Sequence, residues 1–317
     1  MVPLCGLVVT LVWKALTMTP MKNPLYDRFL PTKDVVASLS STIGLCYAPG
    51  LLEALTADVP PPLAFFKSLP TTFLKNWAVY AIVLEKPDLE PLVYTGSGTS
   101  WTYGVWSRIM NYIRGEQLPV LVRKALKEGY TITHKGMYVW APIPPPAIVP
   151  EGRLLFTGME SVFTFSFWTM GSTTTPKHYG MREMFPWEFE DLTYGGCNTH
   201  NCLFEHPIGD FDLTPEERTA HANEMYERQL DGMRKRRAEA QEYDLAAYNE
   251  ELAAQGRKWR RDNPDADRAK THRYEAKNLR EGKWRCEICD RKFSRKPTLT
   301  RHLGTTMHAT NVARLAH

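Results

Sequence analysis

Four side chains near the C-terminus combine the residue types and the spacing that bind zinc. They follow the pattern C-x2-C-x12-H-x5-H and are Cys286, Cys289, His302 and His308. Zn²⁺ prefers four tetrahedral sulfur and nitrogen ligands, and a segment this short has too little core to fold without a metal. The three apolar residues that a small ββα unit needs are also in place, at Trp284, Phe293 and Leu299. The sequence therefore predicts a ββα zinc finger at residues 284–312 with structural Zn²⁺.

The ligands fix the finger's helix and hence the side chains that could face a base. Counting back from His302, the helix-entry, third and sixth readout positions are Arg295, Thr298 and Arg301. Arginine at such positions pairs with guanine in the major groove, and one finger covers about three base pairs. The five-residue gap between the histidines also resembles matrin-type fingers, which favour RNA or structured duplexes. Nucleic acid is therefore the predicted partner, DNA ahead of RNA, and the preferred triplet stays open.

Charge is distributed unevenly along the 317 residues. The net charge is +4, but residues 257–317 hold 17 Lys/Arg and 7 Asp/Glu, which leaves the preceding part negative. A basic segment of this kind favours contact with phosphate. An aromatic ring set among basic residues can stack on a base while its neighbours hold phosphate. We therefore predict nucleic-acid binding by the basic cluster, defined as Arg257, Lys258, Trp259, Arg260 and Arg261.

A second group of residues could hydrolyse phosphodiester bonds. Tyr80 and Tyr94 lie on two expected strands, where an antiparallel hairpin would place both phenols on one face. Arg108 and Tyr112 follow one turn apart on an expected helix. Glu160 is the one acidic residue between 153 and 170, and its burial requires a cation, a metal or a cleft. Together these groups could stabilise phosphate charge, hold a metal and move a proton.

The block from Trp77 to about Glu205 resembles a GIY-YIG nuclease domain, in the divergent form found in fungal proteins with a C-terminal zinc finger. The stretches that carry the resemblance are WAVYAIVL, LVYTGSGTS, GVWSRIMNYIRG, KALKEGYTITHKGMYVWAPIP, RLLFTGMESVFTFSFW and YGGCNTHNCLFE. The chain departs from the family pattern at three packing positions, Ala78, Val79 and Thr95, and in the longer segment from Gly96 to Arg108. The resemblance implies a Mg²⁺- or Mn²⁺-dependent endonuclease.

The resemblance also assigns a role to each candidate residue. It implies that Tyr80 is the general base, that Tyr94 orders water and phosphate, and that Arg108 binds the scissile phosphate with Tyr112 beside it. Glu160 would hold one Mg²⁺. A late asparagine would support the site, and Asn201 is a better candidate than Asn198. The alternative is a non-catalytic zinc-finger protein, a DNA regulator or an RNA binder, in which the body is a degenerate nuclease.

The elements that must position these residues follow from periodicity. Residues 77–84, 92–96 and 131–143 read as strands, and 104–114, 119–128 and 153–170 read as helices. Thr214 to Glu217 form a capping box that opens a charged helical arm, and Asn263-Pro264 opens a second helix. The expected fold is α+β, a small central antiparallel sheet of about three strands flanked by helices, followed by the arm and the finger. The expected boundaries are 1–75, 76–213, 214–283 and 284–312.

Several classes are disfavoured by composition. Residues 2–13 are apolar, but no basic residue precedes them and the stretch is too short to span a bilayer, so we interpret it as a buried helix or the product of a misplaced start codon. The scattered cysteines Cys5, Cys46, Cys197 and Cys202 do not form a disulfide framework. The arm lacks the seven-residue apolar repeat of a coiled coil. Together with the finger, these features predict an intracellular, nuclear protein without a membrane partner.

Overall fold

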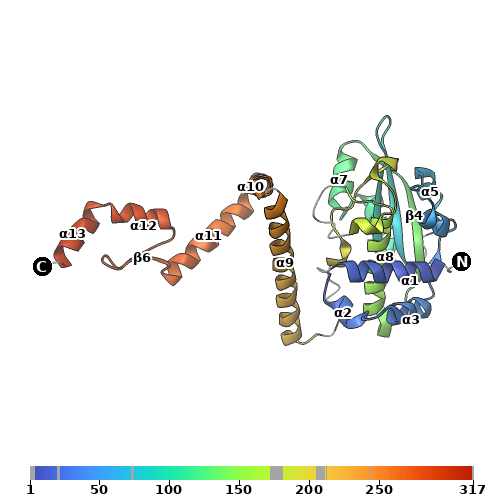
Figure 1. Cartoon of the computed structure of the whole chain (residues 1–317), viewed down its shortest axis with the longest axis horizontal. Coiled ribbons are helices and arrows are strands. Elements are labelled where there is room, and N and C mark those ends of the chain that lie inside the picture. The colour runs from blue at the N-terminus through green and yellow to red at the C-terminus, as the bar shows by residue number, and fades with distance from the viewer. Residues whose placement is uncertain are drawn as a thin grey trace. The chain divides into compact units, whose positions relative to one another are not determined.

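The chain forms two compact units, Met1–Arg236 and Arg237–His317, which are described separately. The computed structural model describes residues 4–19, 22–72, 75–171, 181–204, 211, 213–243 and 245–315 (Figure 1). We refer to the first unit as the body. The second unit contains two helices of the arm and the finger.

The body is built on a mixed five-stranded sheet in the order β1-β4-β2-β3-β5. Its strands are β1 (Cys46–Tyr47), β2 (Asn76–Glu85), β3 (Leu92–Gly98), β4 (Thr131–Pro142) and β5 (Gly195–Gly196). β5 pairs parallel to β3, and the other pairings are antiparallel. The α+β class is as expected, but the sheet has five strands rather than about three. The two additional strands have two residues each, too few for any periodic signal.

The central strand β2 is buried on both faces and therefore reads as a continuous apolar run. One face, with Tyr80 and Ile82, packs against α6 (Trp106–Arg114) and α7 (Val120–Lys127). The other face, with Val79 and Ala81, packs against α8 (Val149–Ser166), the long apolar helix predicted as the spine. The sheet thus separates two cores that have no buried residue in common, and only the partly buried Trp140 packs against both among the described residues.

Residues 4–72 complete the larger of these cores. α1 (Leu4–Met18) buries Val8, Val12 and Leu16 and packs against α8 and α3 (Lys33–Ile43). This confirms the buried helix predicted at residues 2–13. Three short helices, α2 (Leu25–Phe29), α4 (Leu51–Thr56) and α5 (Leu63–Ser68), fill the remaining edges. No helix in the described ranges has both the length and the apolar character that crossing a bilayer requires.

Among the described residues of the body, one 3₁₀ turn precedes α8 and three follow it. They are η1 (Pro146–Ile148), η3 (Met181–Met184), η4 (Phe189–Asp191) and η5 (Cys202–Phe204). η3 and η5 pack against α8, so this loop-rich segment closes over the spine helix. Aromatic rings dominate the closure: Phe185 stacks on Phe189 at 5.1 Å between ring centroids.

The arm begins where the capping box predicts. α9 (Pro215–Tyr243) follows Thr214, whose backbone N–H donates to the Glu217 carboxylate at 2.9 Å. In return, the Thr214 hydroxyl accepts from the Glu217 backbone N–H at 3.2 Å. This reciprocal pair satisfies amide donors at the helix start. The arm continues as α10 (Leu245–Asp262) and α11 (Pro264–Glu281).

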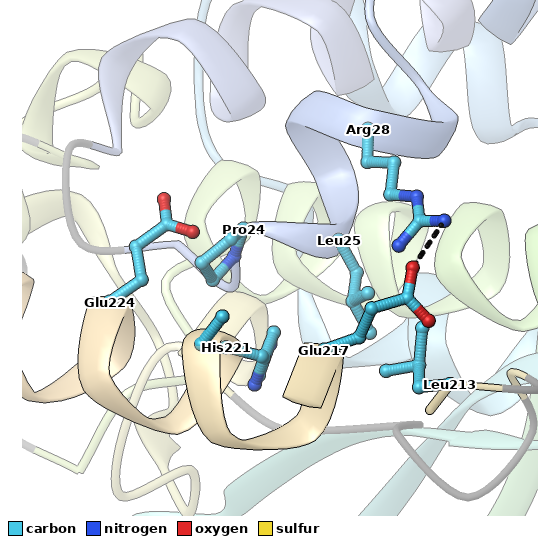
Figure 2. Close-up of a pocket in the computed structure, with 8 residues that line it drawn as sticks. Pro24, Leu25, Arg28, Leu213, Glu217, His221 and Glu224 are labelled. Atoms are coloured by element: carbon cyan, nitrogen blue, oxygen red, sulfur yellow. Dashed lines mark hydrogen bonds and ion pairs between the residues drawn. The ribbon is translucent and has the colours of Figure 1, made fainter. Parts of the chain in front are cut away.

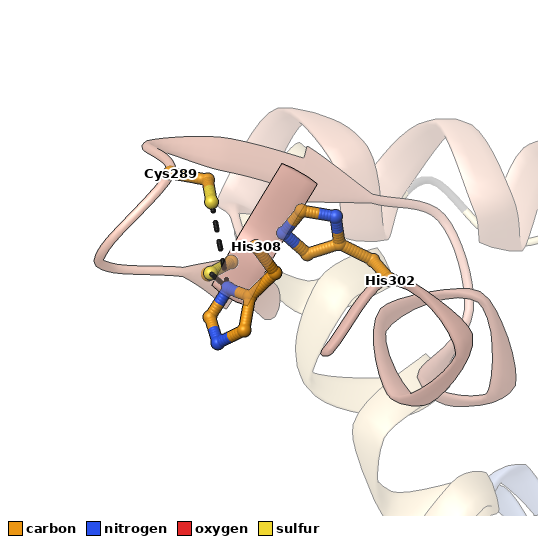
Figure 3. Close-up of side chains that lie close together, drawn as sticks. Cys289, His302 and His308 are labelled. Atoms are coloured by element: carbon orange, nitrogen blue, oxygen red, sulfur yellow. Dashed lines mark hydrogen bonds between the residues drawn. The ribbon is translucent and has the colours of Figure 1, made fainter. Parts of the chain in front are cut away.

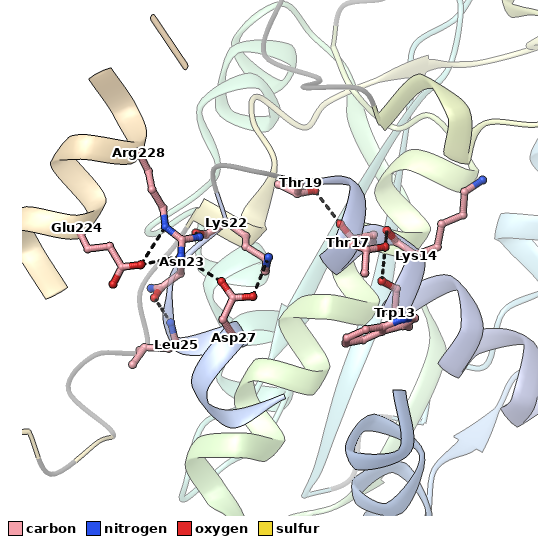
Figure 4. Close-up of polar contacts among 11 residues, drawn as sticks. Trp13, Lys14, Thr17, Thr19, Lys22, Asn23, Leu25, Asp27, Glu224 and Arg228 are labelled. Atoms are coloured by element: carbon pink, nitrogen blue, oxygen red, sulfur yellow. Dashed lines mark hydrogen bonds and ion pairs between the residues drawn. The ribbon is translucent and has the colours of Figure 1, made fainter. Parts of the chain in front are cut away.

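Polar contacts hold the first half of α9 against α2 within the body (Figure 4). The Arg228 guanidinium donates to the Asp27 carboxylate at 3.0 Å and to the Lys22 carbonyl at 3.1 Å. His221 and the Asn23 amide oxygen are 2.8 Å apart. The lysine and arginine beside Asp27 oppose the effect of burial and hold its pKa below the ordinary value.

The C-terminal elements form the predicted ββα finger. β6 (Trp284–Cys286) pairs antiparallel with β7 (Arg291–Phe293), and α12 (Lys296–Leu303) packs against both. A further helix, α13 (Thr306–Leu315), follows and carries His308. The two strands and the helix α12 follow one another in the order that the ligand spacing predicts.

Candidate functional site

The four predicted zinc ligands converge in the finger (Figure 3). The ligand atoms of Cys286, Cys289, His302 and His308 all lie within 4.8 Å of one another. The His308 Nδ1 lies 3.5 Å from both sulfurs. Tetrahedral Zn²⁺, with bonds of about 2.0–2.3 Å to nitrogen and sulfur, requires separations of this order. Among the described residues this is the one group with metal-binding composition and spacing.

The burial of His302 gives an independent sign that the centre holds a metal. Its side chain is 5% exposed, and its Nε2 atom is buried without a hydrogen-bond partner. A buried imidazole nitrogen left without a partner costs free energy, whereas coordination to Zn²⁺ satisfies it. The residues therefore fit a structural zinc ion with four protein ligands.

The surroundings of the centre hold the ligands in place. The Phe293 ring packs 4.9 Å from the His302 ring, which supplies the apolar contact that the sequence predicts for this position. The Asn311 side-chain amide donates to the Cys289 sulfur at 3.3 Å. Such contacts outside the ligand set orient a thiolate and stabilise its charge. Asn311 was not anticipated from the sequence, because it lies beyond the last ligand.

The helix α11 packs against the finger through Asn278 and Glu275. Asn278 is buried, and its side-chain amide donates to the Ser294 carbonyl at 3.0 Å. Its backbone carbonyl accepts from the Lys283 backbone N–H at 3.1 Å. Glu275 on the same helix forms an ion pair with Arg295. The finger is thus more than its ββα core, since α11, the last helix of the arm, packs against it.

The three predicted readout residues lie in different environments. Thr298 and Arg301 are exposed on α12. Arg295 stands just before that helix, and its guanidinium is engaged by the Glu275 carboxylate. Arg295 therefore reads a base only by leaving or sharing this carboxylate. This pairing could not be predicted from the sequence, because the two partners are 20 residues apart.

The basic cluster lies at the C-terminal end of α10 and is exposed throughout. Trp259 is 44% exposed, and the Lys270 ammonium lies 5.9 Å from the centroid of its ring. Two members are already paired with acids, Arg257 with Glu250 at 2.5 Å and Arg261 with Asp262 at 3.6 Å. The predicted combination of an aromatic face and neighbouring cations is present, with part of its charge neutralised.

The body brings the three predicted tyrosines together. The phenol oxygens of Tyr80 and Tyr112 are 3.2 Å apart, and the ring of Tyr94 lies 6.5 Å from that of Tyr80 and 6.4 Å from that of Tyr112. Opposite Tyr80 on β3 stands Gly96, and a Cβ there would lie 2.8 Å from the Tyr80 phenol oxygen. The glycine thus makes room for the phenol. The hairpin and the shared face were both predicted.

Arg108 and Glu160 act electrostatically on the same tyrosine. Burial raises the pKa of Tyr80, the positive charge of Arg108 and a hydrogen bond with Tyr112 oppose the rise, and the negative charge of Glu160 adds to it. Burial acts to lower the pKa of Arg108, but the phenols of Tyr80 and Tyr112 raise it above its usual value. Tyr94, Arg108 and Tyr112 therefore lie with Tyr80 on one side of the sheet, and Glu160, on the helix that packs against the other face, acts on the Tyr80 phenol through its charge. We call these five residues the tyrosine cluster.

The two late asparagines lie at different places around this group. The Asn198 side chain accepts from the Thr95 backbone N–H at 2.9 Å and donates to the Thr95 carbonyl at 2.7 Å, next to Tyr94 on β3. The Asn201 side chain accepts from the Ser161 hydroxyl at 3.0 Å, next to Glu160 on α8. The Asn198 side chain thus pairs with the backbone of Thr95 as a neighbouring strand would. This role cannot be predicted from spacing.

A shallow pocket of about 200 Å³ lies elsewhere, between α2 and α9 (Figure 2). Its lining includes Leu25, Leu213 and His221, with the Arg28–Glu217 ion pair at 3.3 Å. None of the candidate catalytic or metal-binding residues lines it. The pocket therefore does not mark the tyrosine cluster or the zinc centre.

Comparison with known proteins identifies the finger and leaves the body without a match. Residues 267–309 match the sequence model of the BED zinc finger family. Neither the curated proteins nor the solved structures contain a match to the chain. Nothing in these comparisons supports the resemblance of the body to GIY-YIG nucleases. The match includes α11, in agreement with the packing of Asn278, and the chain thus carries a C-terminal BED zinc finger, a type of unit that implies DNA binding.

Proposed function

We propose that this protein is a zinc-dependent DNA-binding protein, in which the BED finger recognises duplex DNA and the basic cluster adds phosphate contacts. The observation that carries the proposal is the convergence of four zinc ligands inside the segment that matches the BED family. The excess of positive charge after residue 256 supports the same partner. A nuclear location follows from this function and is part of the proposal.

The finger offers two freely accessible side chains for base contacts, Thr298 and Arg301. A guanidinium on the exposed face of a finger helix can pair with guanine O6 and N7. Arg295 is instead oriented by its ion pair with Glu275. We therefore assign it a contact with phosphate, or a base contact that forms only when the Glu275 carboxylate releases or shares the guanidinium. DNA is favoured over RNA because the family match implies it.

The test compares two cysteine variants in the full-length, zinc-loaded protein. Cys289→Ser removes a zinc ligand, and Cys46→Ser removes an exposed thiol of the body. We expect Cys289→Ser to weaken binding to a fluorescent duplex by more than about 100-fold, because the finger does not fold without its ligand. Cys46→Ser should bind as the unaltered protein does. Equal affinities of the two variants would contradict the proposal.

A second function, hydrolysis of nucleic-acid phosphodiester bonds by the body, is favoured by one specific observation. The residues that the nuclease resemblance assigns to catalysis lie together in the tyrosine cluster, although they come from separate elements. If the resemblance of these short stretches were fortuitous, there would be no reason for the residues to lie close together in the fold. The support is geometric, and it concerns Tyr80, Tyr94, Arg108, Tyr112 and Glu160.

The chemistry of these residues can be assigned individually. Arg108 is the group to hold phosphate charge. Glu160 supplies the carboxylate for one Mg²⁺, an ion that proteins often bind through one or two carboxylates together with substrate phosphate. When bound, the ion would polarise the phosphate. A phenol is protonated at neutral pH, so Tyr80 is able to donate a hydrogen bond, and burial raises its pKa further. The general-base role implied by the resemblance therefore requires this pKa to fall when substrate binds.

Supercoiled plasmid incubated with the full-length protein tests the second function. We expect nicking with Mg²⁺ that EDTA abolishes, and a loss of at least about 100-fold in Glu160→Gln and in Arg108→Lys. Arg114→Lys, at the exposed end of α6, is the matched control and should keep the activity. Plasmid that stays intact with zinc-loaded protein, while duplex binding persists, would leave the DNA-binding proposal standing and remove the nuclease.

A further inference from the structure

Three large aromatic side chains protrude from the short segment between β3 and the first turn of α6. Trp101 is 50% exposed, Tyr103 is 55% exposed and Trp106 is 41% exposed. Burial of an aromatic side chain is among the largest apolar contributions to folding, and here three are left in water within six residues. Exposed apolar groups that gather in this way mark a surface that binds something.

The segment is held firmly by the body. The Val105 backbone N–H donates to the Asn76 carbonyl at 2.7 Å, and the Trp77 indole donates to the Ser100 carbonyl at 3.1 Å. Gly104 has a φ of +56°, and a Cβ there would lie 2.1 Å from the Asn76 oxygen. The tight turn therefore requires glycine. The aromatic rings are displayed from a preformed turn rather than from a loose loop, and so binding costs little ordering.

Arginines lie on the same stretch of chain as the rings, and the first acidic residue after them is Glu116. Residues 99–115 contain two arginines, Arg108 and Arg114, and no Asp or Glu. Arg153 of α8 donates to the Thr99 carbonyl at 3.1 Å and so places a third guanidinium at the base of the segment. Rings interspersed with guanidinium groups are the combination that binds unpaired nucleotides, because every base has a face that stacks and every nucleotide carries a phosphate.

We propose that Trp101, Tyr103 and Trp106 form a stacking platform for unpaired nucleobases, so that the body binds single-stranded or locally melted nucleic acid. The inference rests on the proposed DNA binding by the finger and extends it to a second contact of different selectivity. The arginines on this segment and Arg153 at its base favour a nucleotide, which carries phosphate, over an apolar protein surface, which would gain nothing from them. The platform leads directly into α6, the helix that carries Arg108 and Tyr112.

The experiment measures the affinity of the full-length, zinc-loaded protein for two DNA molecules that share one duplex sequence. One is fully paired, and the other carries a single-stranded extension of ten thymidines. We expect the extended DNA to bind at least about tenfold more tightly. Trp101→Ala and Trp106→Ala should each remove about tenfold of this advantage, whereas Trp101→Phe and Trp106→Phe, which keep a ring, should retain most of it. Tyr226→Ala, at an exposed tyrosine of α9, is the control and should change nothing.

A fluorescence readout accompanies the titration. Stacking on bases should quench tryptophan fluorescence, and Trp101→Phe and Trp106→Phe, which leave Trp259 in place, should each lose part of that quenching. Equal affinity for both DNA molecules, or an undiminished advantage in the alanine variants, would overturn the platform while duplex binding through the finger persists. Loss of duplex binding itself in Cys289→Ser reports on the proposed function instead, so the two failures are distinguishable.

Discussion

The finger and the body reach their folds by opposite physical routes. The finger buries few side chains, chiefly Cys286, Phe293 and His302, and depends on a metal to hold two short strands and a helix together. The body buries two extensive apolar cores on the faces of one sheet and, within its described residues, has no group of metal-binding side chains. The ligands of a metal centre have a characteristic spacing in the sequence. The contacts of a packed core join residues far apart in the chain and become visible only in the tertiary structure.

The difference explains why the finger could be assigned from the sequence, whereas the tertiary packing of the body could not. Four ligands and three core residues define the finger almost completely, and the BED family match agrees with them. The tyrosine cluster depends instead on β2, β3, α6 and α8 packing correctly.

Removal of zinc should give the largest difference in stability between the finger and the body. Chelation should unfold the finger entirely, because binding free energies of about 10–16 kcal/mol hold such domains together. The body should keep its cooperative unfolding transition. Urea titrations followed by tryptophan fluorescence and by circular dichroism check both, with and without the chelator. A body transition that moves with zinc would contradict the independence of the two routes.

A large-to-small change in the body's core should have the converse effect. Phe163 is fully buried and its ring lies 4.9 Å from that of Tyr138. Phe163→Ala should lower the free energy of unfolding of the body by about 3–5 kcal/mol through lost burial and a cavity. The zinc affinity of the finger should not change. Ile113→Ala, at a side chain that is 58% exposed, is the control and should cost less than about 0.5 kcal/mol.

Alkaline pH should destabilise the body through its buried tyrosines. Burial raises the pKa values of Tyr80, Tyr138 and Tyr194 above the ordinary value of 10.0. Above pH 10 the unfolded chain loses these protons and the folded body keeps them, so stability is complete below that pH and falls as pH rises toward the raised pKa values. Each group contributes about 1.4 kcal/mol per pH unit in this window. Tyr80→Phe should reduce the slope of unfolding free energy against pH by one proton, and an unchanged slope would contradict the assignment.

The smallest effect concerns the docking of α9 on the body. The Arg228 side chain is 23% exposed and bonds to Asp27 and to the Lys22 carbonyl. Arg228→Ala should destabilise the body by about 1–2 kcal/mol, the lower part of the range for charged hydrogen bonds because the site is partly solvated. Arg234, whose ion pair with Asp231 is exposed, is the matched control. Its alanine variant should cost at most about 0.5 kcal/mol in the same chemical denaturation.

The sequence predicted those parts that local rules determine. The hairpin of Tyr80 and Tyr94, the spine helix and the capping box at Thr214 all follow from periodicity or turn chemistry. Other features depend on residues far apart in the chain. The pairing of Arg295 with Glu275 crosses 20 residues, and the bonds of Asn198 to Thr95 cross 103.

The same division applies to the candidate site. Zinc ligands are predictable because coordination fixes both their chemistry and their spacing. The environment of Tyr80 is set by burial and by charges on two other elements, α6 and α8, and the raised pKa of Tyr80 is therefore evident only in the folded body. Two-residue strands such as β1 and β5 have no sequence signal of their own.

The most direct test of the account is the affinity of the full-length protein for duplex DNA before zinc removal, after it and after zinc is added back. The account predicts salt-sensitive binding that chelation abolishes and that Zn²⁺ restores, while the near-ultraviolet circular dichroism of the body stays the same. Binding that survives complete removal of zinc would contradict the claim that the finger holds the DNA.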